Sequence, residues 1–117
     1  MYSKEIMITN VKLHIAAFYK ISVNQLEEGH NWFPDVEARH ICIWILNEYI
    51  FNNLSPSARY SSIKKYFKSA PSRTNIYSLI KKINQERLLY DQNFKQNFTI
   101  IESFVKHQIE SYEKFNN

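Results

Sequence analysis

The sequence predicts a single all-α domain of five or six helices around one central helix, spanning residues 1–117. A chain of 117 residues, 44% of them hydrophobic, is long enough and apolar enough to bury a core. One glycine and three prolines leave few positions suited to tight hairpin turns. The apolar residues also recur at the three- and four-residue spacing of amphipathic helices. These observations favour helices over a sheet.

The first helix is predicted to begin at residue 9 or 10 and to end at residue 19. Its apolar positions repeat at helical spacing: Val11, Ile15, Phe18 and Tyr19. Asn10 can cap this helix, because its side chain can accept from a free backbone N–H of the first turn. Residues 1–8 either extend the helix or fray, and the sequence leaves both open.

The next segment, 20–35, is predicted to be short and irregular. Ser22 or Asn24 can cap a short turn of helix, and Gly29 is well placed to end it. In the connector that follows, residues 30–35, we expect the aromatic side chains to pack beneath neighbouring helices.

The central helix is predicted over residues 36–51. Pro34 and Asp35 precede it; proline suits the start of a helix, and an acid is stabilised by the positive end of the helix dipole. Residues 41–46 are apolar nearly all round the helix. That pattern is typical of a helix contacted on several sides.

A helix–break–helix pattern follows the loop at 52–57. The first helix, 57–67, carries three apolar residues on one face: Tyr60, Ile63 and Phe67. Residues 68–72 break it, and Ser72 can cap the second helix, 73–89. The second helix is expected to bury four side chains: Ile76, Leu79, Ile80 and Ile83. This pair predicts a helix-turn-helix at 57–89.

A last amphipathic helix is predicted over residues 93–115, after a break at 91–93. Its apolar side chains form a wide stripe: Phe94, Phe98, Ile101, Phe104, Val105 and Ile109. The stripe either completes the core of the monomer or forms a self-association surface for a homodimer.

Basic residues are concentrated in one segment, 59–87, which holds eight of them and one acid. The basic residues are Arg59, Lys64, Lys65, Lys68, Arg73, Lys81, Lys82 and Arg87. This segment therefore carries +7 and the other 88 residues carry −3, which together give the net charge of +4. A concentrated cationic surface gains affinity for nucleic acid by releasing condensed counterions.

The predicted helix-turn-helix suggests a division of roles among these residues. If the second helix buries its isoleucines, four side chains near its start point outward toward the edges of DNA bases: Arg73, Thr74, Tyr77 and Ser78. Five lysines have the reach to bind phosphates: Lys64, Lys65, Lys68, Lys81 and Lys82. The alternative interpretation is a basic, solvated helical hairpin without a ligand.

The sequence indicates no enzyme, metal site or cofactor. Cys42, the only cysteine, is expected to be an inert core residue in a reducing compartment. The four histidines lack metal-ligand spacing, and no glycine-rich phosphate loop or paired-acid motif occurs. With no apolar run long enough to cross a bilayer and no export signal, we expect a cytoplasmic, nucleoid-associated protein without membrane contact.

Three segments in order resemble the C-terminal DNA-binding domain of the bacterial chromosomal replication initiator DnaA. They cover residues 11–26, 36–48 and 74–83. The resemblance implies a helical domain with a Trp-repressor-like helix-turn-helix. It also implies a phosphate-binding role for Arg39, which matches a DNA-contacting arginine of the family.

The chain departs from that family at three places, one of which is a longer loop at 52–57. Residues 69–73 read Ser-Ala-Pro-Ser-Arg where the family has Gly-Gly-Arg-Asp-His, and Asn31, Trp32 and Phe33 replace a basic run before the central helix. The expected function is binding of duplex DNA in the regulation of transcription or replication. The alternative is a protein-interaction module that keeps the fold, has lost base reading and binds a replication or transcription protein.

Overall fold

The computed structural model describes residues 4–68 and 72–116, with only the backbone described for Arg73, Phe115 and Asn116. Over these residues the chain is helical and has no strand, which confirms the predicted all-α class. The elements are α1 (Lys4–Tyr19), α2 (Val23–Glu27), α3 (Asp35–Ile45), η1 (Leu46–Ile50), α4 (Pro56–Lys64), α5 (Arg73–Lys82), η2 (Ile83–Arg87), α6 (Leu88–Tyr90) and α7 (Gln92–Asn116), where η marks a π-helical segment.

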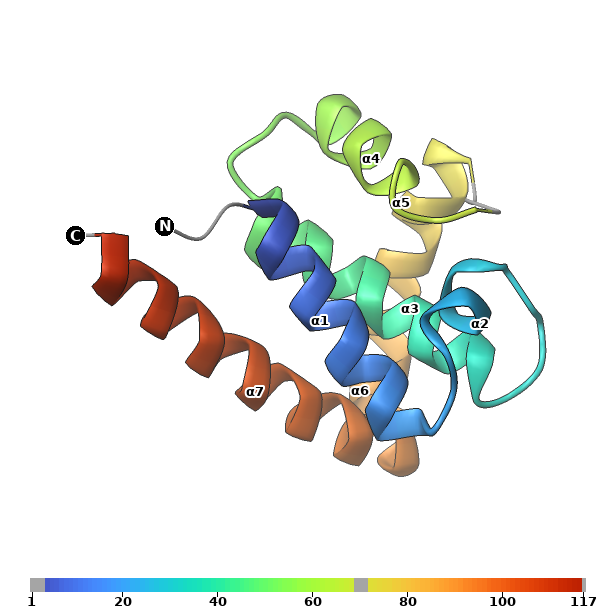
Figure 1. Cartoon of the computed structure of the whole chain (residues 1–117). Helices are drawn as coiled ribbons and strands as arrows, with labels where there is room; N and C mark the ends of the chain where they lie inside the picture. The colour runs from blue at the N-terminus through green and yellow to red at the C-terminus, as the bar shows by residue number, and fades with distance from the viewer. Residues whose placement is uncertain (1–3, 69–71, 117) are drawn as a thin grey trace.

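The central helix is α3, continued by η1, as the apolar run at 41–46 predicts. Every residue from Ile41 to Asn47 is buried. α3 packs against α1, α2, α5 and α7. Figure 1 shows α3 in the middle of the molecule, with α4 at one end and α7 along the opposite edge.

The first helix begins at Lys4, so the described residues before Thr9 extend it. It ends without a glycine, because Lys20 adopts the left-handed conformation with φ 58°. The amides of Lys20 and Ile21 then donate to the carbonyls of Ala17 and Ala16, at 3.1 and 3.0 Å. This arrangement satisfies two carbonyls that the end of the helix would leave unpaired.

The short helix α2 starts and ends as predicted. The Ser22 hydroxyl accepts from the Gln25 amide at 3.1 Å, and the Gln25 side chain accepts from the Ser22 amide at 2.9 Å. This reciprocal pair is a capping box. Gly29 follows with φ 82°, a conformation in which glycine meets no steric penalty.

The prediction for the aromatic connector is wrong, because Trp32 and Phe33 are 60% and 67% exposed. Polar residues occupy the inner positions instead. His30 Nδ1 lies 2.8 Å from the buried carboxylate of Asp35, and Arg39 donates to the His30 carbonyl at 3.1 Å. These contacts fix the connector and leave its aromatics facing outward.

The helix α4 ends at Lys64, three residues earlier than predicted. Tyr66 and Phe67 leave the helix and pack around Lys12 of α1, whose ammonium lies 5.3 Å from each ring centroid. The same ammonium donates to the Tyr66 carbonyl and, at 2.7 Å, to Glu27 of α2. Lys12 is 6% exposed, so its charge is neutralised inside the fold.

The second helix of the pair runs without a break from α5 through η2 and α6, in agreement with the prediction for 73–89. Its inward side chains are Ile76, Ile80 and Ile83, all buried, with Leu79 partly buried beside them. α5 packs against α3 and α4, and the arc that carries Thr74, Tyr77 and Ser78 is left in solvent.

The apolar stripe of α7 completes the core of the monomer, which is the first of the two alternatives that the sequence left open. Four of its six side chains are buried: Phe94, Phe98, Ile101 and Val105. The other two, Phe104 and Ile109, are partly buried against the same core. A homodimer that used this stripe would have to open the monomer.

A buried carboxylate on α3 joins three other elements. Glu37 accepts from Tyr19 of α1 at 2.6 Å, from Asn97 of α7 at 3.0 Å and from Arg87 of η2 at 3.3 Å. The Arg87 guanidinium also stacks over the Phe94 ring, 3.8 Å from its centroid. Three donors satisfy a charge that burial alone would make unfavourable.

Within residues 4–68 and 72–116, none of the helices has the length and apolar composition of a membrane-spanning segment.

Replacing Glu37 by alanine should strongly destabilise the protein. It removes the acceptor of three buried or half-buried donors and leaves Arg87 without its carboxylate, so we expect the free energy of unfolding to fall by about 3–5 kcal/mol. Urea unfolding followed by circular dichroism measures this. The control, Glu110→Ala on the exposed face of α7, should stay within about 0.5 kcal/mol of the wild type. Equal effects of the two substitutions would contradict a special role for Glu37.

Candidate nucleic-acid interface

The outward face of α5 carries the residues predicted to read bases. Thr74, Tyr77 and Ser78 are all exposed, as is Lys81 on the same arc, because the isoleucines of α5 face the core. The Arg73 side chain, also predicted to read bases, lies outside the described residues. The helix start is capped, with Ser72 Oγ accepting from the Asn75 amide at 3.2 Å.

The lysines predicted to bind phosphates are exposed on α4, on α5 and in the segment between them. They are Lys64, Lys65, Lys68, Lys81 and Lys82. Lys68 donates to the Asn24 side chain of α2 at 2.8 Å. Among the described residues, no carboxylate pairs with any of the five. Because α4 packs against α5, Lys64 and Lys81 belong to one pair of adjoining helices.

Two basic residues of the cationic segment hold the fold together instead. Arg59 donates to the carbonyl of Leu54 at 2.9 Å and to that of Asn52 at 3.4 Å, which fixes the loop before α4. Arg87 binds Glu37, as described above. Neither was assigned a DNA-binding role from the sequence.

The assignment of Arg39 as a phosphate ligand is wrong. The residue is 7% exposed, and its guanidinium donates to the His30 carbonyl at 3.1 Å. Burial lowers the pKa of this guanidinium, while the nearby Asp35 carboxylate acts in the opposite direction. The helical period already indicates burial, because Arg39 shares a face with Cys42, Ile43 and Leu46.

A hollow of about 530 Å³ lies between α3 and α5, next to the candidate reading face. It is lined by His40, Asn75, Ser78, Leu79, Lys82, Ile83, Arg87 and Asp91. The sequence does not predict this hollow, although Asn75, Ser78 and Lys82 repeat at helical spacing on one side of α5. Only tertiary packing brings His40 of α3 against that row.

The environment of His40 in this hollow is cationic. Burial lowers the pKa of the imidazole to about 4, and the charges of Arg39, Arg87 and Lys82 act in the same direction. The ring is therefore neutral at pH 7 and keeps one N–H donor and one acceptor nitrogen.

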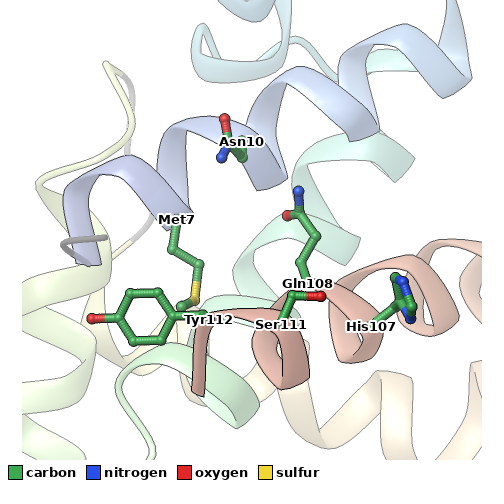
Figure 2. Close-up of a pocket in the computed structure, with 6 residues that line it drawn as sticks. All are labelled: Met7, Asn10, His107, Gln108, Ser111 and Tyr112. Atoms are coloured by element: carbon green, nitrogen blue, oxygen red, sulfur yellow. The ribbon is translucent and has the colours of Figure 1, made fainter. Parts of the chain in front are cut away.

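A smaller hollow, of about 180 Å³, lies between α1 and the second half of α7. Figure 2 shows Gln108 extending from α7 toward α1, with Met7 and Tyr112 near one end. The Oε1 atom of Gln108 is buried and has no hydrogen-bond partner among the described residues. The lining contains no lysine, arginine or carboxylate, so this hollow offers no charge for a nucleic acid.

The thiol of Cys42 belongs to the core, as predicted. It is fully buried in the middle of α3, and burial raises its pKa to about 12. A protonated, buried thiol is a poor nucleophile and a poor metal ligand.

No family model, curated protein or solved structure matches this chain. The assignment of a site therefore depends on the chemistry of the α5 face, the neighbouring lysines and the hollow beside them.

The buried imidazole of His40 predicts a loss of stability in acid. Its pKa in the folded protein is about 4, below the ordinary value of 6.5 for an exposed histidine. The neutral ring therefore stabilises the fold above pH 6.5, and this contribution is lost as the pH falls toward 4, to the extent of about 3 kcal/mol. In thermal unfolding across this range, we expect the stability of His40→Gln to fall less on acidification than that of the wild type. His107→Gln, on the exposed side of α7, is the control and should follow the wild-type profile.

Proposed function

We propose that this protein binds duplex DNA through the exposed face of α5, with the lysines of α4 and α5 on phosphates. The observation that carries the proposal is the exposure of this face on a helix pair whose lysines have no carboxylate partner among the described residues. Thr74, Tyr77 and Ser78 lie in solvent beside Lys81, while the isoleucines of the same helix are buried. A helix with such a face fits the major groove, where hydroxyl and aromatic groups can contact base edges.

Electrostatics supports this choice of partner. Five exposed lysines without a carboxylate partner among the described residues lie on two packed helices or between them. Binding a phosphate with each of them would release condensed counterions, which is the main source of affinity in DNA complexes. The N-terminus of α5 adds free backbone N–H groups that favour an anion.

The resemblance to the DnaA C-terminal domain adds support for the arrangement of the helices and for regulation of replication or transcription as the context. The segments that resemble it form α1 and α2, the central α3, and α5. In that context the protein would act in the cytoplasm, in association with the nucleoid.

A second function, binding of a replication or transcription protein, is favoured by the exposed Trp32 and Phe33. Both rings are more than half exposed at the connector before α3. Large aromatic side chains in solvent are enriched in protein interfaces. Binding at this place would be apolar and would depend little on salt.

Charge reversal on the two helices should weaken DNA binding. We expect Lys64→Glu/Lys81→Glu to reduce the affinity for a short random duplex by well over tenfold at low salt. The slope of log affinity against log salt is negative, and its magnitude should decrease by about 2, which is about 1 for each lost phosphate contact. Fluorescence anisotropy over a series of salt concentrations measures both quantities.

The matched control is Lys106→Glu/Lys114→Glu, two exposed lysines in the second half of α7. This variant has the same change in net charge but should keep the wild-type slope. Equal losses in the two variants would show a general effect of charge and would contradict the assigned interface. Partner binding that persists at high salt and is lost in Trp32→Ala/Phe33→Ala would favour the second function.

Removing two hydroxyl groups from α5 tests base reading separately. In Thr74→Ala/Ser78→Ala we expect the preference between the best and the average duplex to shrink by about 1 kcal/mol for each lost hydrogen bond. Selection from a pool of randomised duplexes, followed by affinity measurements on the enriched sequences, gives that preference. The exposed Ser103→Ala on α7 is the control. An unchanged ranking of sequences would show that these hydroxyls do not read bases.

A further inference from the structure

The hollow between α3 and α5 has one polar wall and an apolar lining. Asn75, Ser78 and Lys82 form the wall on α5, and His40 faces them from α3. Leu79 and Ile83 supply the apolar part of the lining. Because Ser78 belongs both to this wall and to the exposed face of α5, the hollow opens next to the proposed reading surface.

Of the two cations that line the hollow, one has carboxylate partners and the other does not. Arg87 is held by Glu37 at 3.3 Å and lies 3.9 Å from Asp91, the only carboxylate of the lining. Lys82 has no carboxylate partner among the described residues. The charged groups near His40 are thus Arg39 on α3, Lys82 on α5 and Arg87 on η2, with Asp91 beyond α6.

Several groups of the hollow can donate hydrogen bonds to an anion. The ammonium of Lys82, the hydroxyl of Ser78, the amide of Asn75 and the N–H of the neutral His40 ring can all donate. A phosphate presents several acceptor oxygens in a compact anionic group, and charge-assisted hydrogen bonds to it are strong. The volume of about 530 Å³ exceeds what a single phosphate fills, so the attached sugars also have room.

We propose that this hollow binds a phosphate group, supplied by the backbone of the duplex that contacts α5, between Lys82 and Ser78 on one side and His40 on the other. That the phosphate belongs to duplex DNA rests on the proposed function. That these side chains bind a phosphate rests only on the composition of the hollow. The bound phosphate fixes the position of α5 along the backbone, and the remaining exposed face of α5 then meets the groove.

Phosphate binding in the hollow has a signature at His40. An anion opposite the ring counteracts the cations that surround it, so protonation becomes more favourable in the complex than in the free protein. The pKa of His40 is therefore higher in the complex, and the affinity for duplex rises as the pH falls from neutral toward about 5.

The experiment follows the imidazole resonances of the full chain by NMR as a function of pH, alone, with saturating short duplex and with inorganic phosphate. We expect duplex to raise the pKa of His40 by about one to three pH units, and to leave the resonances of His107 on α7 unchanged. Inorganic phosphate should produce a smaller rise. Lys82→Gln should abolish most of the rise, whereas Lys81→Gln, which weakens duplex binding, should keep it at saturating duplex.

A second measurement stays well above the pKa of His40 in the free protein, which is about 4. The affinity for duplex should increase several-fold between about pH 7.5 and about pH 5.5 in the wild type and should stay flat in His40→Gln. If duplex binds and neither measurement shows a change at His40, the hollow does not bind a phosphate of the duplex. The proposed function would remain in place. A Lys82-dependent response to inorganic phosphate without duplex binding supports the phosphate chemistry and overturns the duplex as its source. No response to either probe overturns the inference.

Discussion

The architecture depends on one buried carboxylate, that of Glu37 on α3. Its three donors come from α1, η2 and α7, so a single side chain fixes the distances among four elements. Removing such a charge from water is costly, and the cost is offset only while every donor stays in place. Hydrogen bonding to Glu37 and burial both raise the pKa of the Tyr19 hydroxyl, with burial the larger effect. This phenol therefore remains a donor over the physiological range.

The same kind of constraint holds the chain at residues 66–68, after α4. Lys12 of α1 is neutralised by Glu27 of α2, and the aromatic rings of Tyr66 and Phe67 close over its ammonium. The Lys68 amide then donates to the Glu27 carbonyl at 3.0 Å. One buried ion pair therefore anchors the chain before α5, and the Arg87–Glu37 pair anchors η2 after it. Buried ion pairs thus hold the described segment before α5 and the segment directly after it.

Local signals were enough to predict the helices, because each depends on neighbouring residues: the isoleucine period of α5, the Ser22 cap, and Pro34 with Asp35 before α3. Contacts between residues far apart in sequence were not predictable in this way. The Trp44 indole donates to Asn84 at 2.9 Å, across 40 positions, and His40 meets Lys82 across the hollow by the same kind of packing. The exposure of Trp32 follows from the inner polar cluster that His30 and Asp35 form with Arg39, a set of contacts that no periodicity indicates. The exposed face of α5 could therefore be predicted from the sequence. The hollow beside it could not, because it forms only when α3 packs against α5.

The distribution of chemical groups on α5 also bears on what kind of DNA binding is proposed. Thr74 and Ser78 carry hydroxyls, which both donate and accept, so each can pair with more than one base. A lysine on a phosphate, in contrast, adds affinity whatever the base sequence. If His40, Ser78 and Lys82 also take a phosphate, one of the two hydroxyls is used for positioning and fewer groups remain for discrimination. Such an interface would derive its affinity mainly from charge, and α5 would add only a modest sequence preference. It would differ in this from interfaces whose specificity comes from bidentate arginine–guanine contacts.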